Sequence, residues 1–181
     1  MAKRIFQSNL SVKGIQQLKK DLLNYKDQQL PSLLDWFVLK LAESGIPTIE
    51  QEMANASYTY DEKGVQSGSD TTHKTYVKLN RLVGLSEAIL VLEGEEVLFI
   101  EFGAGVHYNG TKGTSPHPKG QENGFLIGTY GMGNGSKQVW GYYADGGELV
   151  LTRGTEATMP MYKADQEIVK NVIRIAREVF A

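Results

Sequence analysis

The chain has 181 residues, a formal net charge of -2 and no cysteine. This length fits a single domain, the charge balance provides no excess of Lys and Arg for broad nucleic-acid binding, and the absence of cysteine excludes disulfides and thiolate metal sites. No stretch approaches the roughly 20 apolar residues of a spanning helix, and the start of the chain has no apolar stretch of signal-peptide length. We therefore expect a protein that is made and kept inside the cell.

Helical periodicity dominates residues 1–58, the predicted N-terminal helices. Residues 11–28 carry apolar side chains at helical spacing, with Ser11 as an N-cap. A second apolar stripe begins at Pro31, a residue that the first turn of a helix tolerates. Pro47 then begins a fresh helix or kinks the same one, and we favour one bent helical unit.

The middle of the chain, residues 72–154, contains short runs rich in β-branched and aromatic residues. Runs at 72–80, 87–94 and 95–103 predict three antiparallel strands. Gly94 lies between the last two runs and favours a tight hairpin turn there. We expect these last two strands to lie side by side.

A long loop at residues 103–138 contains many of the chain's 20 glycines. Loops of this length are uncommon in compact domains and are usually functional or disordered. Residues 137–154 then offer two short strands around the turn at Asp145, Gly146 and Gly147, which predicts a further hairpin.

The C-terminal residues 159–181 form a predicted amphipathic helix with apolar residues at helical spacing and charges between them. Helices first, strands in the middle and a helix last indicate an α+β fold instead of alternating βαβ units. We expect one domain over 1–181, with a small twisted antiparallel sheet and helices packed on one face.

Three histidines are the only candidates for imidazole chemistry, and two of them lie in the long loop. His107, His117 and Glu101 match the two-histidine, one-carboxylate set of some metal sites. Their spacing is not diagnostic, because helical metal motifs place ligands one turn apart. We favour polar loop histidines and predict neither a metal nor a cofactor.

Glu101 ends the apolar run "VLFI" and has two interpretations. A carboxylate in apolar surroundings can have a raised pKa and act as a general base. Alternatively, it faces water as the last solvent-facing step of a strand, or it caps loop amides at the end of the sheet. No partner nucleophile, phosphate-binding loop or nucleophile elbow accompanies it, so we predict no catalytic residue and no enzyme.

The glycine-rich region also carries large aromatic rings, which suit a partner interface better than a rigid site. Trp140, Tyr142 and Tyr143 could stack a ligand, although core packing is favoured for this cluster. The predicted interface comprises Glu101, Gly103, Gly105, Tyr108, Phe125, Tyr130 and Trp140.

Several segments of the C-terminal half, taken in order, resemble one family. They are "LFIEFGAG" at 98–105, His117-Pro118, "GTYGMGNG", "VWGYY", "TRGTEATMPMYKA" and a final "IAREVF". Together they cover 97–180 and resemble small tailed-bacteriophage proteins of the tail-completion, head-tail joining and minor capsid type.

The resemblance implies a structural virion protein of the phage neck or upper tail, assembled in the host cytoplasm. Such subunits form rings, commonly sixfold, that link the head to the tail, so the implied partners are further copies of the chain, the connector or adaptor, and tail-tube proteins. DNA would pass through the ring without sequence-specific contact, and no membrane is involved. No catalytic residue carries over from the family.

Two alternatives stay open. The first is a small metal-dependent hydrolase that uses the loop histidines. The second is a nucleic-acid-binding or toxin-antitoxin-like module, which the acidic balance disfavours.

Overall fold

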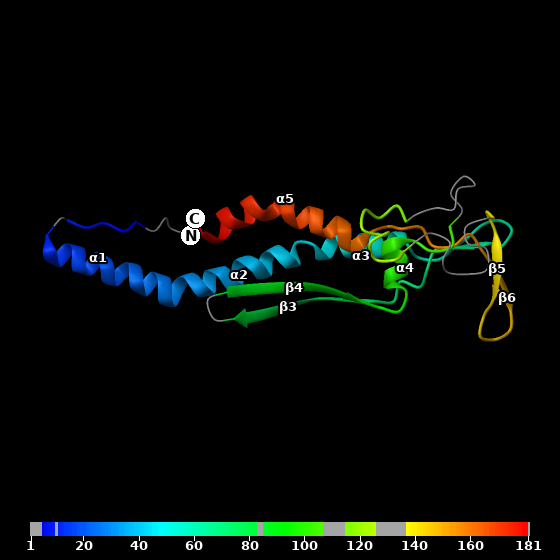
Figure 1. The fold of residues 1–181 in the computed structure, drawn as a ribbon, viewed down its shortest axis with the longest axis horizontal. Coiled ribbons are helices and arrows are strands. Elements are labelled where there is room, and N and C mark those ends of the chain that lie inside the picture. The colour runs from blue at the N-terminus through cyan, green and yellow to red at the C-terminus, as the bar shows by residue number, and fades with distance from the viewer. Residues whose placement is uncertain (1–4, 10, 83–84, 107–114, 126–136, 181) are drawn as a thin grey trace. The chain divides into compact units, whose positions relative to one another are not determined.

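We describe the chain from a computed structural model, which covers all residues except 1–4, 10, 83–84, 107–114, 126–136 and 181 (Figure 1). Helices combine with small sheets, which confirms the predicted α+β fold. The chain divides into two compact units, which we describe separately; the prediction of one domain stays a prediction. Unit 1 comprises Met1–Ile46, Tyr76–Val91 and Gln166–Ala181, and unit 2 comprises Pro47–Thr75 and Leu92–Asp165.

The first helices of unit 1 begin where the sequence predicts. Helix α1 spans Val12–Asn24, and the Ser11 hydroxyl caps it by accepting the Gly14 N–H at 3.1 Å. The chain continues through a π-helical stretch, η1 (Tyr25–Gln29), into α2 (Leu30–Glu43), whose first turn holds a proline. The predicted N-cap and first-turn proline are therefore both confirmed.

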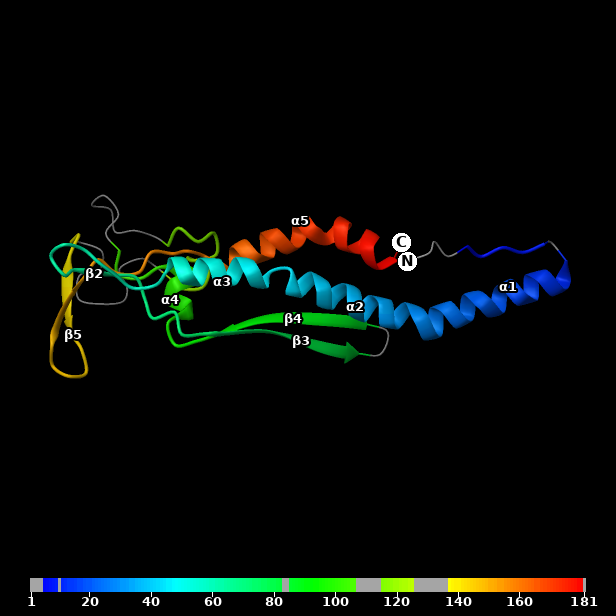
Figure 2. The same cartoon turned by 180° about the vertical axis from the view of Figure 1, so that it is seen from behind.

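The small core of unit 1 forms around α2. The rings of Phe37 on α2 and Phe180 on α5 (Pro160–Phe180) lie 5.4 Å apart between centroids. The two-stranded sheet of β3 (Lys74–Leu82) and β4 (Leu85–Glu93) approaches the same helix. There Asp35 accepts from the Ser86 hydroxyl at 2.6 Å and pairs with Arg81 at 2.8 Å. Figures 1 and 2 show α2 running beside both partners.

Unit 2 holds helix α3 (Ile46–Asn55) and a four-stranded sheet in the order β1-β2-β6-β5. Its strands are β1 (Thr59–Tyr60), β2 (Gln66–Ser67), β5 (Trp140–Tyr143) and β6 (Leu149–Thr152). The β5–β6 pair is antiparallel, which confirms the hairpin predicted around Asp145. Strands β2 and β6 are parallel, so this sheet is mixed and separate from the β3–β4 sheet, where one antiparallel sheet was expected.

The run "VLFI" is not a strand, contrary to the prediction. It forms the short helix α4 (Val97–Phe102), so the strand of 95–103 and the hairpin turn at Gly94 are both wrong. Val97, Ile100 and Glu101 are buried while Leu98 is exposed, which is the three-to-four-residue period of a helix. A run this short fits either structure by periodicity alone, and its packing within unit 2 decided the outcome.

Helix α4 ends at Gly103, whose φ of 81° is a left-handed conformation that favours glycine. Ala104 then exchanges two backbone hydrogen bonds with Thr155, at 2.9 and 2.8 Å. Gly103 and Gly105 both belong to the predicted interface, and the residue between them pairs with the segment that follows β6 in the same chain.

In the described part of the chain, none of the helices has both the length and the apolar character needed to cross a membrane.

Candidate functional site

The start of helix α5 lacks a cap of its own. Its first intrahelical bond runs from the Lys163 N–H to the Met159 carbonyl, so the N–H groups of Met161 and Tyr162 need acceptors from elsewhere. Pro160 has no N–H, Met159 has no side-chain oxygen, and the first turn contains no acidic residue. This helix terminus therefore depends on a carboxylate or carbonyl from another segment.

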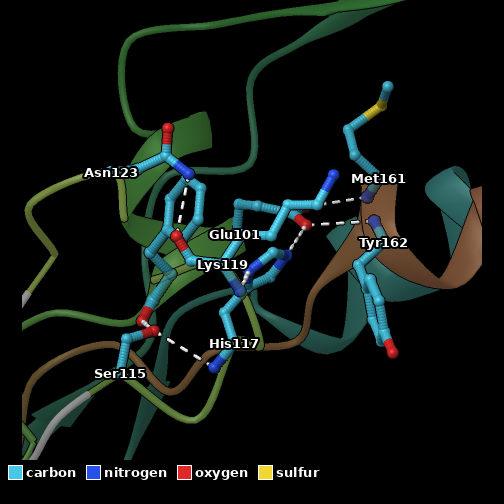
Figure 3. A network of polar contacts seen from close by, with 8 residues as sticks. Glu101, Ser115, His117, Lys119, Asn123, Met161 and Tyr162 are labelled. Carbon is cyan, nitrogen blue, oxygen red and sulfur yellow. Dashed lines mark hydrogen bonds and ion pairs between the residues drawn. The ribbon is translucent and has the colours of Figure 1, made fainter. Parts of the chain in front are cut away.

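Glu101 on α4 supplies that acceptor. Its Oε2 accepts the Met161 N–H at 2.8 Å, and its Oε1 accepts the Tyr162 N–H at 3.0 Å. The side chain is 7% exposed, and a negative charge at a helix N-terminus is favoured by the helix dipole. Figure 3 shows the carboxylate pointing from α4 at both amides. The predicted solvent-facing position of Glu101 is wrong, and the amides that it caps belong to a helix instead of a loop.

His117 completes the arrangement from the other side. Its Nε2 lies 3.0 Å from Oε1 of Glu101, and its Nδ1 accepts the Lys119 N–H at 3.0 Å. Because Nδ1 is an acceptor, the ring proton of the neutral histidine is on Nε2 and is donated to the carboxylate. The side chain is 5% exposed and packs edge-on against the rings of Phe102 and Tyr162, at 4.6 and 5.2 Å.

The segment 115–125 holds this histidine in place. The Ser115 hydroxyl donates to the Phe102 carbonyl and accepts the His117 N–H at 3.2 Å. The Asn123 side chain donates to the Lys119 carbonyl at 2.8 Å (Figure 3). Phe125 stacks on Phe102, with ring centroids 4.2 Å apart and an angle of 11°. This part of the predicted long loop is folded against its own chain.

The chemistry available to the pair is limited, because its polar atoms are already engaged. Both oxygens of Glu101 accept backbone N–H groups, and both nitrogens of His117 have partners. A metal would have to displace these hydrogen bonds. Among the described residues, no three His, Cys, Asp or Glu side chains lie close enough together to hold a metal ion, and His107 of the proposed ligand set lies outside them.

The other predicted interface residues have different surroundings. Gly105, at a φ of 66°, lies against Trp140, whose Nε1–H donates to the Gly105 carbonyl at 2.8 Å. Trp140 is half-buried, while Tyr142 and Tyr143 of the same strand are exposed. Tyr108 and Tyr130 lie outside the described residues. The structure thus brings Glu101 together with His117 and Phe125, and Gly105 together with Trp140.

The sequence analysis missed the link between Glu101 and the start of α5, although one signal for it was present. A helix that begins with Met159-Pro160 has no local side-chain acceptor, which indicates a cap from a distant residue. A lone carboxylate in an apolar run is a candidate for that cap. Sequence spacing gives no means of pairing the two, because 60 residues separate Glu101 from Met161.

Comparison of the chain with protein families, with curated proteins and with solved structures found no match.

Proposed function

We propose that this chain is a structural subunit of a tailed-bacteriophage neck or upper tail, where copies of it form a ring that links head and tail. The family resemblance of 97–180 motivates the proposal. The observation that carries it is the uncovered apolar face of helix α1, because such a face requires a partner.

Helix α1 has a well-defined apolar side and no buried residue. Val12, Ile15, Leu22 and Leu23 are 73%, 52%, 45% and 45% exposed. At about 100° per residue these side chains fall on one side of the helix, and Lys13 and Asn24 fall on the other. In the described part of unit 1, only the residues before α1 run alongside it (Figures 1 and 2).

A helix of 13 residues is marginal in water by itself, and most helical stability in proteins comes from packing an apolar face. Contiguous exposed apolar surface on a soluble protein marks an interaction site. The occupant that we propose for this face is a neighbouring copy of the chain, as a ring of identical subunits requires. A heterologous contact of this kind closes into a ring when its rotation permits.

The buried pair of Glu101 and His117 is consistent with this role. Its atoms serve to fix the start of α5 and leave no free base or nucleophile in the cluster. A subunit without turnover needs such a rigid scaffold more than a reactive group. The cluster therefore favours a structural role for unit 2.

Native mass spectrometry of two variants with the same change in charge tests the proposal. Ile15→Glu with Leu22→Glu adds two negative charges to the apolar side of α1 and is expected to yield a folded monomer. Lys13→Gln with Asn24→Glu shifts the net charge by the same amount on the polar side and is expected to assemble like the wild type. Circular dichroism checks that both variants are folded.

Two results would overturn the proposal. One is equal assembly of the two variants. The other is a wild-type protein that stays monomeric at all concentrations and is missing from phage particles analysed by mass spectrometry.

A further inference from the structure

Unit 2 contains a small open cavity that the predicted functions do not use. Its volume is about 220 Å³, and it lies beside the β2-β6-β5 part of the sheet. One carboxylate, that of Glu96, and several aromatic side chains line it, among them Tyr58, Phe99, Trp140 and Tyr142. Pockets for whole drug-sized ligands usually measure about 300–1,000 Å³, so this cavity suits a smaller group, such as the end of one side chain.

The aromatic wall is held in a fixed position. The Trp140 Nε1–H donates to the Gly105 carbonyl, and a Cβ on Gly105 would lie 2.6 Å from the indole ring. Only glycine therefore permits this close approach. The Tyr142 ring is 6.0 Å from that of Trp140 between centroids and is tilted by 46°. Tyr58 and Tyr142 are both exposed, so the rings are accessible from solvent.

The cavity also carries the negative charge of Glu96, which has no cationic partner among the described residues. Oε1 of Glu96 accepts from the Tyr58 hydroxyl at 3.3 Å, and Oε2 accepts the Asp70 N–H at 2.8 Å. Glu96 forms no ion pair with any Lys, Arg or His that the structure describes. Burial, and next the charge of Glu96, raise the pKa of Tyr58, which agrees with a negative potential at this wall.

We infer that this cavity binds an organic cation, either an ammonium or a guanidinium group carried on a short alkyl chain. Aromatic faces attract such cations through their quadrupoles, and the attraction is stronger for rings as large as that of Trp140. Glu96 supplies the opposite charge, and the cavity volume admits one such group. The cation can come from a lysine or arginine side chain of a protein or from a free small amine. The inference does not depend on the proposed function.

A titration followed by NMR tests the inference on the full-length, ¹⁵N-labelled chain. The protein has two tryptophans, so two indole N–H signals report on two places at once. Trp140 lines the cavity, whereas Trp36 in unit 1 already has the Lys40 Nζ 4.7 Å from its ring centroid. N-acetyl-lysine amide and tetramethylammonium are expected to shift the Trp140 signal saturably and to leave the Trp36 signal in place.

A neutral analogue of the lysine compound shows whether binding depends on the positive charge or only on the alkyl chain. The same lysine compound acetylated on its Nε keeps the alkyl chain but lacks the positive charge, and it is expected not to shift the Trp140 signal. Tighter binding of the lysine compound than of tetramethylammonium indicates a protein side chain as the source, and the reverse order indicates a free amine. The inference is overturned if no cation shifts the Trp140 signal, or if the neutral analogue shifts it equally.

Two variants assign the effect to the cavity. Glu96→Gln removes the negative charge from the wall and is expected to weaken cation binding about tenfold. Glu148→Gln removes the same charge from an exposed position outside the cavity lining and is expected to bind like the wild type. Equal affinity of both variants for the cation would contradict the inference, provided that their melting temperatures match.

Discussion

The two units of the molecule bury different kinds of side chain. In unit 2, Ile49, Met53 and Ile100 are completely buried, and the polar pair of Glu101 and His117 is enclosed with them. In unit 1, the largest fully buried side chain is Val179, while most apolar residues of α1 remain exposed. The core of unit 2 therefore encloses large apolar side chains together with a hydrogen-bonded polar pair. In the described part of unit 1, the apolar side of α1 stays exposed.

We propose that this difference separates a part that packs on itself from a part that contacts a neighbouring copy. Enclosed polar groups fix a unique packing, provided that every one of them has a partner. Exposed apolar surface adds little to the stability of an isolated chain, because its burial occurs only on association. The comparison can be tested with substitutions whose effects should differ between the units.

The largest effect is expected from removing the carboxylate at the start of α5. Glu101→Ala leaves the His117 Nε2–H and two backbone N–H groups without an acceptor. Each buried unsatisfied donor costs about 1–3 kcal/mol. Because three donors lose their acceptor together, we expect the free energy of unfolding, measured by urea denaturation, to fall by about 3–5 kcal/mol.

Glu101→Gln is the matched control for that variant. It keeps one side-chain oxygen as an acceptor and nearly the same shape, so its loss of stability should be smaller than that of Glu101→Ala. If Glu101→Ala were as stable as the wild type, the hydrogen bonds of Glu101 to His117 and to the start of α5 would not stabilise unit 2.

A smaller but distinct difference is expected from truncating one isoleucine in each unit. Ile49→Ala empties a completely buried site in unit 2 and should cost about 2–5 kcal/mol. Ile15→Ala lies on the exposed face of α1 and should change the free energy of unfolding by less than about 0.5 kcal/mol. Urea denaturation at a concentration where the chain is monomeric measures both values. If both variants lost the same free energy of unfolding, the proposed difference between a packed unit 2 and an exposed α1 in unit 1 would be wrong.

The smallest effect is expected at Asp61, in the turn between β1 and β2. The Val65 N–H and the guanidinium of Arg153 lower the pKa of Asp61 from 3.8 to about 2. The unfolded chain therefore takes up this proton first as the pH falls. The stabilisation is complete above about pH 4 and is lost as the pH falls toward 2.

The melting temperatures of the wild type and of Asp61→Asn measure this contribution. Their difference should be largest above pH 4 and should shrink as the pH is lowered to 2. A difference that stays constant between pH 5 and pH 2 would show that the charge of Asp61 contributes nothing.

In unit 2, the sequence predicted the glycine-rich loop but not the contacts that its side chains make. Its composition predicted a long loop, but the described segment 115–125 packs on α4 through Ser115, His117 and Phe125. Composition reports the conformational freedom of the backbone and does not report the partners of individual side chains. This segment of the predicted long loop is therefore packed against its own chain.

Local signals in the sequence predicted several features that the structure confirms. The cap at Ser11, the first-turn Pro31, the hairpin around Asp145 and the long C-terminal helix all depend on residues within a few positions of one another. Such short-range signals need no knowledge of the rest of the fold.

Long-range packing set the conformation of "VLFI" and the role of Glu101. Six residues are too few for periodicity to separate helix from strand, so the packing of Val97 and Ile100 settled α4. The hydrogen-bond donors of a carboxylate likewise depend on which N–H groups the fold brings near it. Here the donors lie on His117 and at the start of α5, and folding places them within 3.0 Å of Glu101.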